Sequence, residues 1–298
     1  MNNHDHVGWT RNVQARMEAR MAEILPQPNL VPERLHQAMR YAVLGGGKRV
    51  RPLLSHAAGE LTGADKSRLE IVSASVEMIH AYSLVHDDMP CMDDDVLRRG
   101  KPTVHIEYDD ATALLVGDAL QALAFQIVAE NRLCDSEAQQ LNMITLLGQA
   151  CGSRGMAGGQ AIDLASVGKN LSLPELEFMH IHKTGALIRA AVLMGAACGR
   201  ELDEKQLAAL DRYAKCVGLA FQVVDDVLDA EASTATLGKT AGKDAKDGKP
   251  TYVSIMGAAQ AKALADELHG EALQALENYD AQADRLRFLA DYIVKRQH

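Results

Sequence analysis

The stretch His86–Gly100 reads H-D-D-M-P-C-M-D-D-D-V-L-R-R-G and places five aspartates within fifteen residues. The run before it, Ile71–Val85, is apolar at helical spacing, so we expect the aspartates at the end of a buried helix. Clustered carboxylates raise one another's pKa unless a cation neutralises them. Because oxygen ligands dominate and Cys91 is the only thiol between them, Mg²⁺ is the favoured cation. A solvated acidic helix end is the alternative, but Arg98 and Arg99 favour an anion that shares the metal.

A second acidic cluster lies far along the chain, where residues 221–229 read F-Q-V-V-D-D-V-L-D. Asp225 and Asp229 are four residues apart and share one helix face, and Gln222 lies one turn earlier on that face. Two like charges at this spacing destabilise an apolar helix unless they are paired or bound to metal. The surrounding valines and leucine leave little polar surface, so a solvent-facing acidic stripe fits poorly. Together the two clusters predict a metal-dependent anion site.

Composition favours an all-α fold. Of the 298 residues, 47% are hydrophobic but only 4% are aromatic, so the core must consist mainly of Leu, Ala, Val, Ile and Met. The sequence contains no runs of alternating β-branched residues, which would predict a large sheet, and no segment has the composition of a linker between domains. We therefore expect one domain over residues 1–298, built from roughly ten or more helices. These helices are expected at about 9–24, 32–44, 48–61, 68–85, 109–131, 136–150, 155–165, 175–198 and 203–229 and within 251–298, with a loop at 230–250.

Charge and cysteine usage exclude several classes of protein. The formal net charge of −9, without a basic stripe, argues against a nucleic-acid partner. The five cysteines are dispersed and lack zinc spacing, which indicates reduced thiols in a cytoplasmic protein. The N-terminal M-N-N-H-D-H shows no signal peptide, and nothing approaches a charge-free apolar span of about eighteen residues, so we expect no membrane span. An acidic protein that binds phosphate would need metal ions.

The two acidic clusters resemble the paired aspartate-rich motifs of the trans-isoprenyl diphosphate synthases. The first motif is D-D-x-x-x-x-D (Asp87, Asp88, Asp93) and the second is D-D-x-x-D (Asp225, Asp226, Asp229). Further signatures of that family follow in order: G-G-G-K-R-V-R-P at 45–52, L-R-R-G-K-P-T at 97–103, G-G-Q-A-I-D-L at 158–164, H-K-T-G at 182–185 and G-K at 238–239. The glycine stretch is not a Walker P-loop, because the spacing and the preceding strand are missing. The two extra residues of the first motif are similar to those of bacterial members that produce farnesyl diphosphate.

This resemblance implies a deep central cavity in the helical bundle, with the two motifs facing each other across its mouth. About three Mg²⁺ ions would link the carboxylates to the diphosphate of an allylic substrate. The implied metal-binding residues are Asp87 and Asp93 on one side and Asp225 on the other, with Asp88, Asp226 and Asp229 as further ligands or as acceptors behind them. The reaction would break the allylic C–O bond and leave a carbocation. The double bond of isopentenyl diphosphate would attack it, and the released diphosphate would accept the final proton.

The resemblance also assigns substrate-binding residues. Arg98, Lys183 and Lys239 would stabilise the charge that grows on the leaving diphosphate, and Lys249 would close over it and exclude water. The additional lysines at 243 and 246 leave open which lysine of this segment does so. Isopentenyl diphosphate would be held without metal by Gly47, Lys48, Arg51, His80 and Arg99. Thr184 and Gln222 would position the allylic group, and the family relation implies a homodimer.

Product length depends on the helix that precedes Asp87. One helical turn spans about 5.4 Å, roughly one isoprene unit. Tyr82 is bulky and Ser83 is small, and in the family these positions form part of the cavity floor. Their combination is similar to that of members that stop at farnesyl diphosphate, a C15 product built from dimethylallyl and geranyl diphosphate.

Three alternatives remain open at the level of sequence. A geranylgeranyl diphosphate synthase would share every motif except the details of the floor. A terpene cyclase also ionises allylic diphosphates, but it needs no isopentenyl diphosphate site, so the intact stretch at 45–52 counts against it. A non-catalytic subunit of a heteromeric synthase would be expected to lack aspartates, whereas both motifs are complete here.

Overall fold

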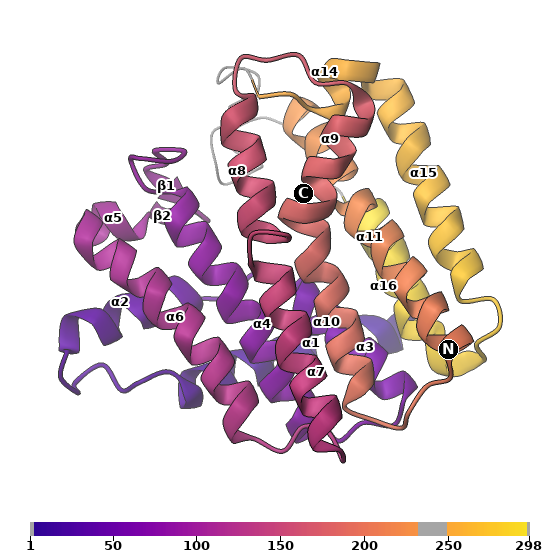
Figure 1. Cartoon of the computed structure of the whole chain (residues 1–298), viewed down its shortest axis with the longest axis horizontal. Coiled ribbons are helices and arrows are strands. Elements are labelled where there is room, and N and C mark those ends of the chain that lie inside the picture. The colour runs from indigo at the N-terminus through magenta and orange to yellow at the C-terminus, as the bar shows by residue number, and fades with distance from the viewer. Residues whose placement is uncertain (1–2, 232–248, 297–298) are drawn as a thin grey trace. The chain divides into compact units, whose positions relative to one another are not determined.

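The computed structural model describes residues 3–231 and 249–296, and helices predominate among them, which confirms the all-α prediction (Figure 1). The helices of the first part of the chain are α1 (Asn3–Ile24), α2 (Glu33–Val43), α3 (Val50–Leu61), α4 (Lys66–Asp87), α5 (Val104–Glu107), α6 (Asp110–Glu130) and α7 (Glu137–Cys151). Those of the second part are α8 (Met156–Ser166), α9 (Leu173–His180), a π-helix (Ile181–Gly185), α10 (Ala186–Ala197), α11 (Glu204–Glu231), α14 (Tyr252–Met256), α15 (Ala258–Ala275), a 3₁₀ turn (Ala281–Ala283) and α16 (Asp284–Val294).

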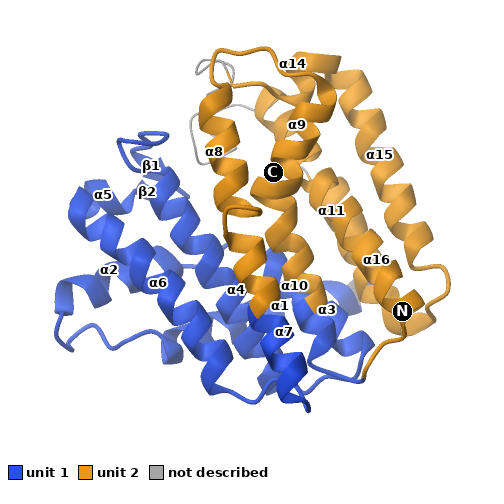
Figure 2. Ribbon diagram, viewed as in Figure 1, with its two compact units in different colours: residues 1–144, 194–200 blue, residues 145–193, 201–298 orange. Residues whose placement is uncertain are grey.

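Contacts among its residues divide the chain into two compact units (Figure 2). Unit 1 comprises residues 1–144 and 194–200, and unit 2 comprises residues 145–193 and 201–298. The single domain expected from the sequence stays a prediction.

Helix α4 lies at the centre of unit 1 and packs against α1, α2, α3 and α6. Every residue from 71 to 79 is buried, because neighbouring helices cover α4 on all sides, and its sequence is correspondingly apolar nearly all round. The helix ends at Asp87, and Asp88 is its C-cap. The predicted position of the first aspartate motif at the end of a buried helix is therefore confirmed.

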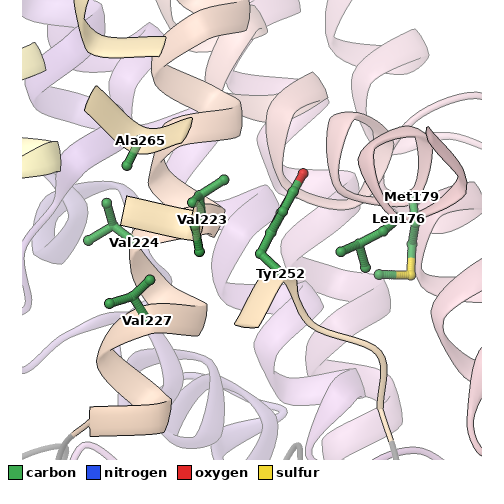
Figure 3. Packing of buried hydrophobic residues seen from close by; sticks show 8 residues of the cluster. Leu176, Met179, Val223, Val224, Val227, Tyr252 and Ala265 are labelled. Atoms are coloured by element: carbon green, nitrogen blue, oxygen red, sulfur yellow. The ribbon is translucent and has the colours of Figure 1, made fainter. Parts of the chain in front are cut away.

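Helix α11 has the same role in unit 2, where it packs against the π-helix, α9, α14, α15 and α16. Figure 3 shows part of the core, with Tyr252 of α14 between the α11 valines and two residues of α9. The valines are Val223, Val224 and Val227, and the α9 residues are Leu176 and Met179. Burial of the valines fixes the rotation of α11 and leaves Gln222 and Asp225 on its less buried side.

The sequence does not predict a two-residue ribbon directly after the first motif. Strand β1 (Leu97–Arg98) pairs antiparallel with β2 (Lys101–Pro102). The two turn residues, Arg99 and Gly100, have φ values of 53° and 74°, as a tight hairpin turn with a matching twist requires. The ribbon thereby fixes Arg98 and Arg99 relative to the aspartates.

Two expected helices are interrupted. The helix expected at 175–198 consists of α9, the π-helix and α10. The C-terminal helical region is interrupted at Gly257, whose φ is 83°, and again at 276–283. Of the loop expected at 230–250, residues 232–248 lie outside the described part of the chain.

Helix α6 is the one described helix that is long and apolar enough to cross a membrane by length and composition alone. This differs from the expectation that no segment would approach a span, because Asp118 is the only charged residue between Asp110 and Glu130. Within unit 1, α6 packs along α4, and the backbone at Gly117 approaches the ring of His86 so closely that a Cβ there would lie 1.9 Å from it. One side of α6 is therefore packed within unit 1, while Leu114 and Leu115 on the helix are exposed. The five cysteines are free thiols.

Candidate functional site

The loop of the first aspartate motif folds back on the end of α4. The backbone N–H of Asp93 donates to the carbonyl of Asp87 at 2.8 Å, and that of Asp95 donates to the carbonyl of Asp88 at 3.1 Å. Asp94 adopts a left-handed conformation with φ of 50° to close this loop. The five-residue separation between Asp88 and Asp93 therefore returns Asp93 to the backbone of Asp87, so the structure brings these two predicted metal ligands together.

Asp88 is engaged by Arg98. It is 2% exposed, and the Arg98 Nε donates to both of its carboxylate oxygens at 2.9 and 2.8 Å while Nη2 donates to Oδ1 at 2.6 Å. Burial raises the pKa of Asp88 above its usual value, although the guanidinium acts in the opposite direction. Arg98 and Asp88, both predicted site residues, thus bind each other.

The glycine stretch of unit 1 depends on positive φ angles. Gly45, Gly46 and Gly47 have φ values of 106°, 85° and 128°, a region that favours glycine. Arg99 lies against this stretch: its Nη1 donates to the Gly46 carbonyl at 2.9 Å, and a Cβ on Gly47 would lie 3.0 Å from its guanidinium carbon. Gly47 therefore lets Arg99 approach the backbone, which places two predicted isopentenyl-binding residues side by side.

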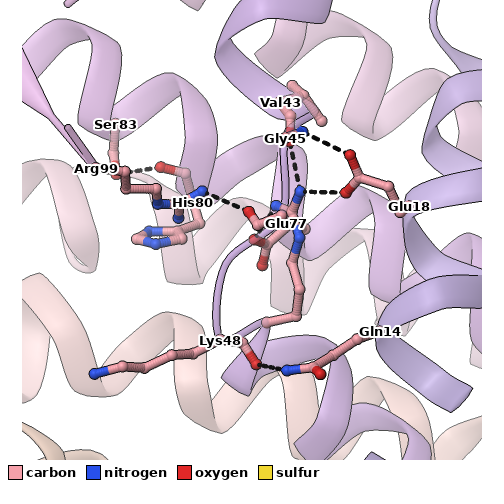
Figure 4. A network of polar contacts seen from close by, with 11 residues as sticks. Gln14, Glu18, Val43, Gly45, Lys48, Glu77, His80, Ser83 and Arg99 are labelled. Atoms are coloured by element: carbon pink, nitrogen blue, oxygen red, sulfur yellow. Dashed lines mark hydrogen bonds and ion pairs between the residues drawn. The ribbon is translucent and has the colours of Figure 1, made fainter. Parts of the chain in front are cut away.

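Arg49 holds this stretch from behind. It is buried, with φ of 49° at the N-cap of α3, and its guanidinium pairs with Glu77 at 2.7 Å and with Glu18 at 2.9 Å. The same guanidinium donates to the Val43 carbonyl at 2.6 Å, and Glu18 accepts the Gly45 N–H at 2.6 Å. Figure 4 shows Glu18 beside Gly45, with the side chain of Lys48 extending away from both. Arg49 was not among the predicted site residues.

Positive charge gathers around His80 in unit 1. Burial and then the charges of four arginines lower the pKa of His80 well below its usual value, so the ring is neutral at pH 7. These arginines are Arg51, Arg99, Arg98 and Arg49. A small cavity of about 80 Å³ is lined by His80, Arg98 and Arg99 together with Lys101. This arginine cluster (Arg49, Arg51, Arg98, Arg99) can attract an anion without metal.

The two predicted chain-length residues lie in the last turns of α4. Tyr82 is buried, and its ring contacts that of His86 edge-on at 5.8 Å between centroids. The His86 Nε2 lies 3.1 Å from the Leu114 carbonyl of α6, so Tyr82 is supported from α6 through His86. Ser83 is half-buried, and its hydroxyl donates to the His80 carbonyl at 2.9 Å.

In unit 2 the first aspartate of the second motif is paired with the C-terminal end of the described chain. The Arg296 Nη2 lies 2.8 Å from the Asp225 Oδ1 and donates to the Phe221 carbonyl at 2.6 Å. Its guanidinium also lies over the Phe221 ring, 3.9 Å from the centroid. The sequence did not predict this pairing, which joins residues far apart in the chain.

The second aspartate, Asp226, is buried and accepts hydrogen bonds from two neutral groups. The Gln222 Nε2 donates to its Oδ1 at 2.8 Å, and the Tyr252 backbone N–H donates to its Oδ2 at 2.9 Å. Thr184 extends the network, because its hydroxyl donates to the Gln222 Oε1 at 3.2 Å. The predicted residues Thr184, Gln222 and Asp226 thus form one hydrogen-bonded chain. Asp229, the third aspartate of the motif, is also buried.

Two predicted lysines converge on Asp163 of the G-G-Q-A-I-D-L signature. The Lys183 Nζ lies 2.5 Å and the Lys249 Nζ 3.9 Å from the Asp163 Oδ2, and Asp163 is buried. Lys183 belongs to the π-helix, a feature often found at functional sites. Gly159 makes this approach possible, because a Cβ there would lie 2.1 Å from the Lys183 nitrogen. Asp163 was missed as a site residue although its motif was recognised, and the predicted Lys239 lies outside the described residues.

The donor chemistry fits Mg²⁺. Within the described residues no three His, Cys, Asp or Glu side chains are grouped as a ready metal cage. Mg²⁺ is usually bound through one or two carboxylates plus phosphate oxygens and waters, so a complete protein cage is not required. The aspartates of each motif offer only oxygen donors, and a cationic side chain lies beside one of them in each unit, Arg98 beside Asp88 and Arg296 beside Asp225.

Known proteins resemble this chain over most of its length. The Polyprenyl synthetase family matches residues 32–290. The chain is 48% identical to farnesyl diphosphate synthase of Escherichia coli (strain K12) over 264 residues, which cover 87% of this chain and 88% of that protein. A farnesyl/geranylfarnesyl diphosphate synthase (FPP/GFPP synthase) structure from Zymomonas mobilis matches with a TM-score of 0.88 and 42% identity over 97% of this chain and 99% of that one. A Helicobacter pylori geranyltransferase structure, complexed with magnesium and isoprenyl diphosphate, matches with a TM-score of 0.84 and 31% identity over 97% and 96% of the two chains. The chain belongs to the polyprenyl synthetase family.

Proposed function

We propose that this protein is a prenyltransferase that condenses isopentenyl diphosphate with dimethylallyl diphosphate and then with geranyl diphosphate to give (2E,6E)-farnesyl diphosphate. The observation that carries the proposal is that each unit places cationic side chains together with residues of its aspartate-rich motif or of a neighbouring signature. Unit 1 offers the arginine cluster beside the first aspartate motif, and unit 2 offers Lys183 and Lys249 together with the second motif. The identity with the Escherichia coli enzyme supports the same reaction.

Metal-assisted departure of diphosphate starts the reaction. Asp87, Asp93 and Asp225 would hold Mg²⁺, with Asp88, Asp226 and Asp229 as further acceptors, and the bound ions would neutralise charge on the leaving group. Lys183 and Lys249 would donate to the diphosphate oxygens, each exchanging its contact with Asp163 for the more highly charged anion. The magnesium in the Helicobacter pylori complex supports the choice of metal. About three ions is the number that we propose.

Isopentenyl diphosphate would bind to cations without metal. Lys48, Arg51 and Arg99 would hold its diphosphate, and Gly47 leaves room for Arg99 beside the backbone. His80 is neutral, so it can donate one hydrogen bond to an oxygen without adding a charge that needs a counterion.

The hydrogen-bonded chain in unit 2 would orient the allylic substrate. Thr184 is anchored to Gln222, and Gln222 to Asp226, so neither side chain rotates without breaking a bond in the chain. Such fixed side chains hold the reacting carbon in place and limit capture of the carbocation by water.

Product length is the sharpest test of the prediction that Tyr82 and Ser83 form part of the cavity floor. Replacement of Ser83 by Phe would fill the turn of α4 next to Tyr82, and we expect the main product to shorten from C15 to C10. Ser83→Ala, which keeps the side chain small, should retain C15. An unchanged C15 fraction in Ser83→Phe would show that the floor assignment is wrong.

The reaction itself is tested by incubation of the purified protein with isopentenyl diphosphate, Mg²⁺ and either dimethylallyl or geranyl diphosphate, followed by dephosphorylation and sizing. Farnesol from both starters is the expected result. Geranylgeraniol would identify a geranylgeranyl diphosphate synthase, and a cyclic hydrocarbon formed without isopentenyl diphosphate would identify a terpene cyclase. A folded protein without Mg²⁺-dependent turnover would fit a non-catalytic subunit.

A homodimer in the cytoplasm is the proposed setting. The family relation supports the dimer, and the five free thiols support a reducing compartment.

A further inference from the structure

Unit 2 contains an open cavity of about 950 Å³ that the proposed reaction does not use. It is lined by the second half of α7, the glycine-rich turn that precedes α8, the outer face of the π-helix and α10, the middle of α11, and Leu268 of α15. None of the residues assigned above to metal, isopentenyl diphosphate or the allylic substrate lines it.

The walls of the cavity are apolar and wide. Leu146, Ala186, Leu219 and Leu268 supply aliphatic surface from four helices. Gly148, Gly152 and Gly185 also line the cavity, and they have no side chains to fill it. The volume lies in the range that accommodates a molecule of drug size, and aliphatic walls favour a flexible hydrocarbon chain.

Cations line the cavity, and carboxylates do not. Arg154, Arg189 and Lys215 are among its lining residues, while no Asp or Glu of the described chain is. Arg189 and Lys215 share one nearby carboxylate, Asp211, so the three cations exceed their counterion by two charges. The neighbouring Glu271 adds no net charge, because it pairs with Arg212 at 3.4 Å. In a protein with a net charge of −9, this excess favours an anionic head group.

We propose that this cavity binds an anionic amphiphile, a molecule with one flexible apolar chain and a phosphate-type head group. The chain would lie against Leu146 and Leu219, and the head group would contact Arg154 and Lys215 at the solvent-facing edge. Binding needs no Mg²⁺, because no carboxylate lines the cavity to hold one. The inference rests on the cavity and its charges, not on the proposed condensation.

The test is titration calorimetry with farnesyl phosphate in the presence of EDTA. We expect saturable binding at micromolar concentration. Leu146→Trp, which fills the cavity, and Arg154→Glu, which reverses a charge, should each weaken this binding at least about tenfold. Leu207→Trp and Arg11→Glu make the same replacements at exposed positions that do not line the cavity, and these variants should bind like wild type. Dodecyltrimethylammonium, with the opposite head-group charge, should not compete.

Two results would overturn the proposal. Binding that is lost in Arg51→Ala but kept in both cavity variants would place the probe at the arginine cluster of unit 1. Absence of binding, with a changed oligomeric state of Leu146→Trp in analytical ultracentrifugation, would show that the cavity is a contact between copies of the chain. Turnover of isopentenyl diphosphate, measured on the same preparations, separates either failure from failure of the proposed function.

Discussion

The second aspartate of each motif is buried, but the two units hold it by different chemistry. In unit 1, Asp88 accepts three hydrogen bonds from the guanidinium of Arg98. In unit 2, Asp226 is 3% exposed and accepts one bond from the Gln222 amide and one from the Tyr252 backbone. A guanidinium keeps its full charge at any pH at which proteins fold, whereas the neutral donors depend on the packing that positions them. The contacts described for Asp88 therefore come from a charged group, while the two described for Asp226 come from neutral groups.

The first aspartates differ as well. Asp87 is the last residue of α4, and its carbonyl is tied to the returning Asp93. Asp225 has a side chain that is 43% exposed and is approached by the buried Arg296. In unit 1 the backbone organises the proposed metal ligands, while in unit 2 a cation covers one of the proposed ligands.

The largest loss of stability is expected from replacement of Arg49, the second arginine in unit 1 that pairs with a buried carboxylate. Arg49→Ala leaves Glu77, which is 2% exposed, without its ion-pair partner. Loss of one partner of a buried ion pair typically costs 3–5 kcal/mol, so we expect the free energy of unfolding to fall by about 4 kcal/mol. Urea denaturation followed by circular dichroism measures the change.

The control for Arg49→Ala replaces both partners. Arg49→Met combined with Glu77→Leu removes the buried charges and should recover most of the lost stability, since Glu18 is partly exposed and can be solvated. If the ion pair mainly positions the glycine stretch, this double variant should still show a raised KM for isopentenyl diphosphate and an unchanged KM for geranyl diphosphate. A single Arg49→Ala variant within 1 kcal/mol of wild type would contradict the claim that unit 1 depends on this charge.

The next largest effect concerns pH and the geometry of unit 2. His180 is buried and stacks on Tyr252 at 5.5 Å between centroids, and Tyr252 donates its N–H to Asp226. Burial, and then the charge of Lys183, lower the pKa of His180 to about 4, although Asp163 acts in the opposite direction. The unfolded chain therefore takes up this proton first as the pH falls below about 6.5, and stability decreases down to about pH 4.

The expected loss from His180 is about 3 kcal/mol across that interval. Denaturation curves at several pH values should show a smaller slope in His180→Phe, which keeps a ring against Tyr252 but cannot be protonated. An identical slope in the variant and wild type would show that His180 is not the group that titrates.

The sequence predicts what depends on composition and periodicity. The buried positions of α4 and α11 are apolar because neighbours surround both helices, so their extents and the aspartates at the end of α4 follow from the pattern. Predicted partners such as Thr184 and Gln222 meet because their motifs lie on packed segments, the π-helix and α11. The aspartate motifs therefore identify the two local sites.

Features that arise from packing between distant segments are not predicted. The π-helix accompanies close approaches at Gly159 and at Gly218, whose missing Cβ would lie 3.1 Å from the Gly185 Cα, and no local residue pattern signals it. The roles of Asp163 and Arg296 likewise require knowledge of which helices adjoin. The left-handed Arg99 in the ribbon turn is unusual for its residue type, which explains why the ribbon was not expected.

The second aspartates of the two motifs can be compared directly by making the same replacement at both positions and measuring the loss of stability. Asp88→Asn removes charged hydrogen bonds from Arg98 and should cost about 2 kcal/mol of unfolding free energy. Asp226→Asn keeps an acceptor for the Tyr252 N–H and loses one neutral bond, so we expect about 1 kcal/mol. Both are measured by urea denaturation in EDTA, which removes any contribution from bound metal. Equal costs would show that the type of partner is unimportant.

The smallest effect is expected at Arg296, where a cation covers Asp225. Because Mg²⁺ and the guanidinium would compete for the same carboxylate, Arg296→Ala should lower the Mg²⁺ concentration that gives half-maximal rate by about threefold, or about 0.7 kcal/mol. Lys295→Ala removes the neighbouring charge, which pairs with Asp291 instead, and is the matched control. A higher Mg²⁺ requirement in Arg296→Ala alone would mean that the guanidinium assists the bound substrate instead of competing with the metal. Unit 2 would then rely on charge at its first aspartate much as unit 1 does at its second.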